Sequence, residues 1–119
     1  MKDKIQANTN TNELNFRIRA IRQALGLTQD EVGGLVGISG VIISLYERGL
    51  IDSKYGPSIE SKLNDVWTMY TKKYGAWYNS YLSLQAATNE IQIWMEINGY
   101  VPENIVKKAK ACALAFTNM

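Results

Sequence analysis

Residues 17–49 read RIRAIRQALGLTQDEVGGLVGISGVIISLYERG, and this stretch decides the fold. Thr28 and Glu31 have the spacing of a capping box, which begins a helix. Gly37 follows at a point where a helix can end in the left-handed region that glycine adopts at little cost. Ser39 can cap a second helix. The spacing therefore predicts two short helices joined by a turn of three or four residues.

Apolar residues on both sides of this stretch recur at helical spacing. A first helix is expected to begin near Asn12, with a buried face made of Leu14, Ile18, Ile21 and Leu25. Pro57 suits the first turn of a later helix, whose apolar stripe is Ile59, Leu63, Val66, Trp67, Tyr70 and Tyr74. Residues 76–87 and 102–117 also have helical patterns. The fold class is therefore expected to be all-α.

Residues 91–97, IQIWMEI, are ambiguous. Apolar and polar residues alternate there as they do in a strand, and the following Asn98-Gly99 is a hairpin signal. The helical patterns on either side, and the very short partner segment Tyr100-Val101, favour a helix. The sequence leaves both alternatives open.

The composition argues against several classes of function. The chain has 119 residues, no histidine, a single cysteine and a formal net charge of +2. Histidine is the commonest general base and metal ligand, so we expect no enzyme, no catalytic residue, no metal site and no cofactor. Cys112 alone cannot form an internal disulfide and fits a reducing cytoplasm. No apolar run is long enough to span a membrane, so no membrane partner is expected.

Residues 17–49 resemble the helix-turn-helix of the Cro/C1 family of phage and bacterial regulators, also called the XRE or lambda-repressor-like family. The residues that carry the resemblance are Gln29, Val32, Gly33, Gly37, Ile38, Ile43 and Tyr46, followed by Glu47-Arg48-Gly49. Gly33 stands where the family needs a very small side chain because two helices cross there. The resemblance implies a lambda-repressor-like helix-turn-helix bundle with a C-terminal helical extension, acting in the cytoplasm as a homodimer on a double-stranded DNA operator.

The resemblance also implies roles for individual residues. The side chains expected to face the bases are Ser39, Gly40, Val41, Ser44 and Leu45. Those expected to meet phosphate are Thr28, Gln29, Arg48 and Lys54. An ion pair between Arg22 and Glu47 is expected to fix the angle between the first helix and the recognition helix. The simplest mechanism implied is repression by blocking polymerase.

The sequence departs from the family pattern on the recognition helix. Residues 32–46 contain no charged residue, and Gly40 and Val41 stand where the family usually has long polar side chains. Bidentate hydrogen bonds to guanine or adenine need such side chains, whereas Val41 and Leu45 offer only contact with thymine methyl groups. An alternative is therefore a protein-interaction module on the same scaffold, such as an antirepressor, a phage-encoded inhibitor or an antitoxin.

The chain divides by pattern into three parts. Residues 1–11 are expected to form a mobile N-terminal arm, residues 12–67 the DNA-binding domain, and residues 68–119 a helical extension that pairs two chains. Aromatic residues cluster near the second boundary, and they fill a core between helices, form a dimer interface, or do both. The residues assigned to the interface are Trp67, Tyr70, Trp77 and Tyr81. Two-fold pairing would place recognition helices about 34 Å apart.

Overall fold

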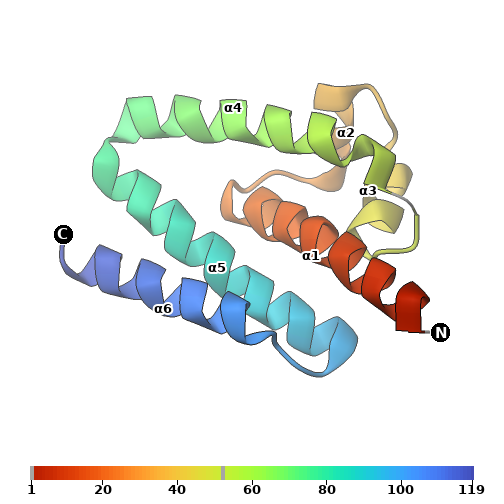
Figure 1. Ribbon diagram of the computed structural model, residues 1–119. Coiled ribbons are helices and arrows are strands. Elements are labelled where there is room, and N and C mark those ends of the chain that lie inside the picture. Colours follow the sequence, from red (N-terminus) through yellow and green to blue (C-terminus); the bar gives the residue numbers. More distant parts are fainter. Residues whose placement is uncertain (1, 52) are drawn as a thin grey trace.

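The computed structural model of the protein describes residues 2–51 and 53–119, with side chains described for residues 13–51 and 54–119. Within these ranges the chain is helical, with no strand, as expected from the sequence (Figure 1). The elements in order are α1 (Lys2–Ala24), α2 (Gln29–Val36), α3 (Gly40–Glu47), a short 3-10 helix η1 (Ser53–Tyr55), α4 (Gly56–Tyr74), α5 (Ala76–Asn98) and α6 (Glu103–Thr117).

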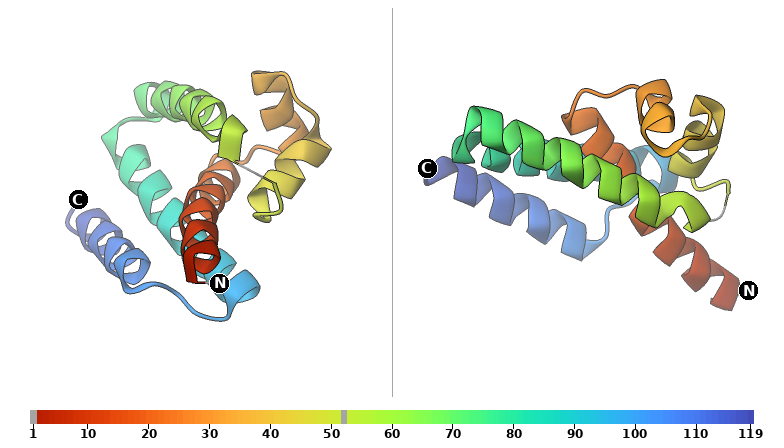
Figure 2. Two further views of the ribbon diagram at one scale, coloured as in Figure 1. Left: turned by 45° about the vertical axis from the view of Figure 1, so that its right-hand side comes forward. Right: turned by 90° about the horizontal axis from the view of Figure 1, so that it is seen from above.

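Helix α1 is the central element of the fold. Figure 2 shows it in the middle of the molecule, with α2 and α3 on one side and α5 and α6 on the other. Ile18 and Leu25 of α1 belong to a first cluster, which also contains buried residues of α2, α3, α4 and α5, namely Val32, Ile43, Tyr46, Ile59, Leu63 and Leu82. The expected buried face of the first helix is therefore correct.

The opposite face of α1 forms a second apolar cluster that the spacing of the first face did not indicate. Phe16 and Ala20 are fully buried there, against Ile93 and Trp94 of α5 and Ile105 of α6. The rings of Phe16 and Trp94 meet edge to face, with centroids 5.0 Å apart. Because both faces of α1 are covered, the C-terminal helices stabilise the same helix on which α2 and α3 rest.

Two glycines allow the sharp turns between the C-terminal helices. Gly75, with φ of 96°, separates α4 from α5, and Gly99, with φ of 75°, ends α5. A residue with a Cβ is strained at such positive φ values. Gly75 thus ends α4, and Asn98-Gly99 ends α5 instead of closing a hairpin.

Two expectations about secondary structure need revision. Residues 91–97 lie within α5, so the strand alternative is wrong. Helix α1 begins at Lys2 and not near Asn12, because the intervening polar residues include no proline or glycine to end it and each added residue gains a backbone hydrogen bond. The expected division of function between residues 67 and 68 stays a prediction, and it falls inside α4.

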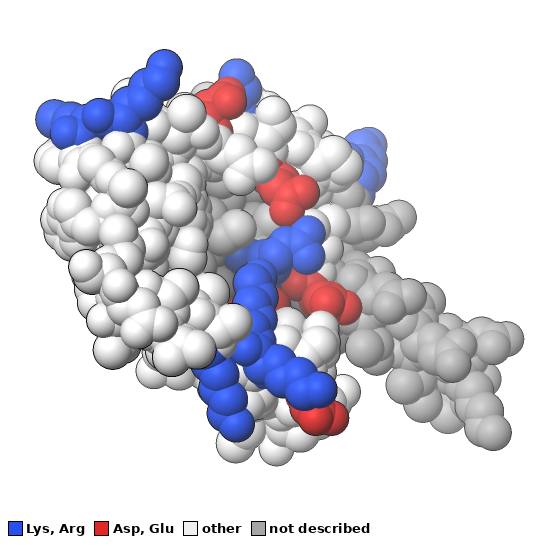
Figure 3. Space-filling model, turned by 60° about the vertical axis from the view of Figure 1, so that its left-hand side comes forward, with Lys and Arg blue, Asp and Glu red and all other residues white. Residues whose placement is uncertain are grey.

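Among the residues whose side chains the structure describes, basic and acidic side chains are mixed over the surface. On the face in Figure 3, basic side chains lie beside acidic ones and most of the surface is uncharged. The pairs formed include Arg17 with Glu60, Lys107 with Glu103, and Lys108 with Glu90. Of the described helices, none is both long and apolar enough to cross a membrane.

Candidate nucleic-acid interface

The start of α2 is fixed by a reciprocal pair of hydrogen bonds. Thr28 Oγ1 accepts from the backbone N–H of Glu31 at 3.0 Å, and Glu31 Oε1 accepts from the backbone N–H of Thr28 at 2.9 Å. The backbone N–H of Thr28, together with its hydroxyl, lowers the pKa of the Glu31 carboxyl. The capping box expected from the sequence is therefore present, and it orders the turn that leads into α2.

The turn between α2 and α3 depends on a missing side chain. A Cβ on Gly33 would overlap the carbonyl oxygen of Ile38 and would lie 3.2 Å from the carbonyl carbon of Ser39. Gly37 ends α2 with φ of 77°, in the left-handed region. Ser39 then caps α3 by accepting from the N–H of Ile42 at 3.3 Å. The two helices can therefore cross closely only while residue 33 is very small.

A buried ion pair connects α3 to α1. The guanidinium of Arg22 donates to Glu47 from two nitrogens, one of them 3.0 Å from Oε1, and the two side chains are 12% and 1% exposed. Arg22 also donates to the carbonyl of Leu27 at 2.7 Å, and the amide of Gln29 donates to Glu47 at 3.1 Å. These bonds join α1, α2 and the end of α3, so they fix the orientation of α3.

The side of α3 that faces away from the core is apolar and accessible. Ile43 and Tyr46 are buried, whereas Val41 is 69% exposed. Of the other residues expected to face bases, Ser39 is exposed, and the half-buried ones are Gly40, Ser44 and Leu45. The structure therefore brings the five expected residues onto one short helix and its cap.

The residues expected to meet phosphate divide into two groups. Arg48 and Lys54 are exposed after α3, and Lys54 Nζ lies 5.3 Å from the centre of the Tyr55 ring. The side chains of Thr28 and Gln29, by contrast, are already engaged in the capping box and with Glu47. At the start of α2, the groups left for an anion are therefore backbone N–H groups of the first turn.

One cationic residue near this surface was not assigned a role from the sequence. Arg19 of α1 lines a small pocket of about 240 Å³ together with Arg22, Gln29, Glu47, Arg48, Glu96 and Ile97. Its guanidinium lies 3.4 Å from the carboxylate of Glu96, which is on α5. The only sequence signal was its position three residues before Arg22. The contact with α5 could not be anticipated from that spacing.

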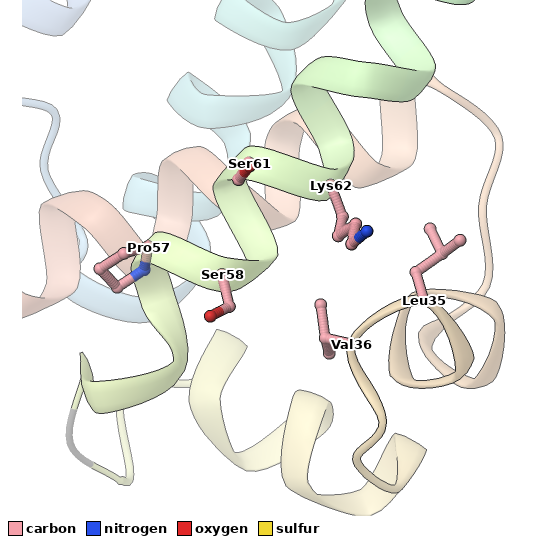
Figure 4. Close-up of a pocket in the computed structure, with 6 residues that line it drawn as sticks. All are labelled: Leu35, Val36, Pro57, Ser58, Ser61 and Lys62. Atoms are coloured by element: carbon pink, nitrogen blue, oxygen red, sulfur yellow. The ribbon is translucent and has the colours of Figure 1, made fainter.

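A separate groove lies between α2 and α4, away from the exposed side of α3. Leu35 and Val36 line it from α2, and Figure 4 shows the first turns of α4 opposite them. The residues on the α4 side are Pro57, Ser58, Ser61 and Lys62, and the groove has a volume of about 440 Å³. It is shallow and open, and no sequence pattern predicted it.

The aromatic residues near the α4–α5 turn are mostly packed against one another. Trp67 Nε1 donates to Asn79 Oδ1 at 2.6 Å, and the Tyr70 ring lies 6.3 Å from that of Tyr78. Tyr81 meets Phe116 of α6 at 6.3 Å. Trp77 differs from these, since it is 53% exposed. Trp67, Tyr70 and Tyr81 thus fit the expectation of a core between helices, whereas Trp77 is accessible.

A protein-family model described as Helix-turn-helix matches residues 18–60, which include the C-terminal end of α1, all of α2 and α3, and the start of α4. The α2–α3 unit is a Cro/C1-type helix-turn-helix. Residues 18–60 therefore form a helix-turn-helix domain of a DNA-binding type. The comparison with curated proteins found no match, and the comparison with solved structures found none either.

Proposed function

We propose that this protein regulates transcription as a homodimer that binds a double-stranded DNA operator and reads the major groove with α3. Repression by blocking polymerase is the simplest mechanism. The observation that carries the proposal is the exposed side of α3, which is held in a fixed orientation by the Arg22–Glu47 pair and by the close crossing at Gly33. A short rigid helix with one free face is the unit that enters a major groove.

The contacts available to DNA are few and weakly polar. Val41 and Leu45 offer apolar contact to thymine methyl groups, and the hydroxyl of Ser44 can bond several bases. Arg48 and Lys54 provide two phosphate contacts in each chain. We therefore expect much of the selectivity to come from DNA shape and from the spacing between half-sites.

Dimer formation is supported by the exposed aromatic surface at the α4–α5 corner. Trp77 is 53% exposed, Tyr74 is 47% exposed and Met69 is 56% exposed. Figure 1 places this corner at the opposite end of the molecule from α3, and the longest dimension of the protein is 45 Å. A two-fold axis at the corner would set the spacing between the two α3 helices, and therefore the spacing between the two half-sites of the operator.

The DNA-binding proposal is tested by selecting duplexes from a randomised library with the full-length chain and measuring their affinity by fluorescence anisotropy. We expect the selected duplex to bind at least ~10³-fold more tightly than a scrambled duplex at the same salt concentration. The double variant Arg48→Ala/Lys54→Ala removes the proposed phosphate contacts, so it should weaken binding to both the selected and the scrambled duplex. Equal affinity for selected and scrambled duplexes would refute specific regulation.

The dimer is tested by changing one exposed aromatic residue and one exposed residue elsewhere. Trp77→Glu should convert the protein to a monomer in light scattering and weaken binding to a two-half-site duplex. Met95→Glu is the control, because Met95 is 52% exposed and lies near the other end of α5 from Trp77. A Trp77→Glu protein that remains dimeric would place the interface elsewhere.

A second candidate function is the binding of a protein partner. It is favoured by the exposed apolar residues Val41, at 69%, and Leu50, at 63%, beside a segment without charge. Val41→Asp should abolish function under either hypothesis, whereas Arg48→Ala/Lys54→Ala should affect only DNA binding. If the Arg48→Ala/Lys54→Ala protein still functions in the cell and the Val41→Asp protein does not, the partner is a protein.

A further inference from the structure

The space beside Gly40, at the beginning of α3, is filled by a side chain from another helix. A Cβ on Gly40 would overlap Asp30 Oδ1, and would lie 3.0 Å from Cγ and 3.3 Å from Cα of the same residue. Asp30 belongs to the first turn of α2 and is exposed. Its carboxylate therefore takes the volume that a side chain at position 40 would occupy.

This placement puts a charged acceptor beside the apolar side of α3. Gly40 begins the side of α3 that we propose to face the bases, and α3 has no charged residue before Glu47. We infer that Asp30, although it lies on α2, is a specificity-determining residue that selects cytosine in the major groove. This inference rests on the proposed function and names one base that the site recognises.

The choice of cytosine follows from the chemistry of a carboxylate. An ionised carboxylate can only accept hydrogen bonds. In the major groove the donors are the N4 amino group of cytosine and the N6 amino group of adenine, whereas guanine and thymine present acceptors. Adenine places its N7 acceptor beside N6, which repels a carboxylate. Cytosine is therefore the base that this group fits best.

Asp30 is free to act in this way, and its neighbour is not. Among residues 13–51 and 54–119, no Lys or Arg forms an ion pair with Asp30. The carboxylate of Glu31 is held by the N–H of Thr28 in the capping box. Glu31 therefore provides a matched control, since it has the same charge and is adjacent in sequence but is already bonded.

The carboxylate also opposes binding to DNA that lacks cytosine at this point. Nearby phosphates repel a negative charge at the start of α3. Binding also removes water from the carboxylate, and only a hydrogen-bond donor on a base offsets that cost. Asp30 should thus lower the affinity for unrelated DNA while it raises discrimination. If Asp30 only stabilised the N-terminal end of α3, its removal would not raise the affinity for unrelated DNA and at the same time reduce discrimination between bases.

The test compares the DNA preferences of the wild-type protein with those of Asp30→Ala, Asp30→Asn and Glu31→Ala, using the same library selection and anisotropy measurements. For the wild type, we expect replacement of one cytosine in each half-site by thymine to weaken binding about tenfold per half-site. For Asp30→Ala, the same replacement should change affinity less than about twofold, and affinity for scrambled DNA should rise. Asp30→Asn should shift the preference to adenine, which asparagine bonds at N6 and N7.

Glu31→Ala should lower thermal stability, because it breaks the capping box, and it should keep the cytosine preference. If wild-type protein selects a specific duplex and Asp30→Ala selects the same one with equal stringency, the role of Asp30 is refuted and the proposed function stands. If the wild type selects no duplex, the proposed function fails, and the role of Asp30 fails with it.

Discussion

Removal of Arg22 should destabilise the protein far more than removal of an exposed arginine from the same helix. In Arg22→Met, the carboxylate of Glu47, which is 1% exposed, loses its charged partner and keeps only the amide of Gln29. An uncompensated buried charge of this kind costs about 3–5 kcal/mol. For a chain of 119 residues, each kcal/mol lowers the midpoint of thermal unfolding by about 4 °C, so the expected loss is about 12–20 °C.

The chain provides a matched control for this experiment. Arg17 is also on α1 and pairs with Glu60 at 3.0 Å, but both side chains are 34% exposed. Solvent screens such a pair, so Arg17→Met should cost only about 0.2–1 kcal/mol. The measurements are urea unfolding of both variants, which gives the free energy of unfolding, and thermal unfolding, which gives the midpoint, both monitored by circular dichroism at constant pH.

A double variant separates the charge effect from lost packing. In Arg22→Met/Glu47→Leu no charge is left buried, and the protein should recover at least half of the stability lost in Arg22→Met. The reasoning is refuted if Arg22→Met and Arg17→Met cost the same. It is also refuted if the double variant is as unstable as Arg22→Met, because the loss would then not come from an uncompensated charge.

Three further results are expected. Gly33→Val should be about 1–3 kcal/mol less stable than Gly34→Val in urea unfolding, because only position 33 is closed by the neighbouring backbone, and equal stability would contradict the close crossing. Burial raises the pKa of the Glu90 carboxyl above its ordinary value of 4.5 despite nearby Lys108, so the folded state holds this proton more tightly than the unfolded state. The free energy of unfolding should therefore lose a contribution as pH rises from 4.5 through the raised pKa, and a pH series of urea unfolding on Glu90→Gln should lack that decline. The slope of log affinity against log salt should be about −4 for a dimer that uses two phosphate contacts per chain, and Arg48→Ala should reduce its magnitude by about 2, whereas an unchanged slope would exclude Arg48 from phosphate contact.

The sequence predicted the α2–α3 unit well because its signals are local. The caps at Thr28 and Ser39, and the glycine at position 37, act within a few residues of themselves, and each has the role that the spacing indicated. The ion pair between Arg22 and Glu47 could also be predicted, because the resemblance to the family implies it. No local pattern in the sequence indicates this contact between distant residues. These features are enough to identify the domain and the helix proposed to bind DNA.

The arrangement of the C-terminal helices was not predictable in the same way. The alternating apolar residues in 91–97 resemble a strand. In the structure, Ile93 is buried against α1, whereas Met95 and Ile97 are exposed near the end of α5. Trp94 is buried against Phe16, and that contact between distant segments decides for a helix. Likewise, the contact of Asp30 with the start of α3 depends on how two helices cross, which the composition of either helix does not contain.

The most direct test of the central claim is a titration of the isotope-labelled protein with its selected duplex, followed by amide NMR. If α3 reads the major groove, the largest changes will fall on residues 39–48 and on the first turn of α2, including Asp30, with little change along α6. If the changes instead fall on α6 or on the groove between α2 and α4, α3 is not the helix that reads DNA.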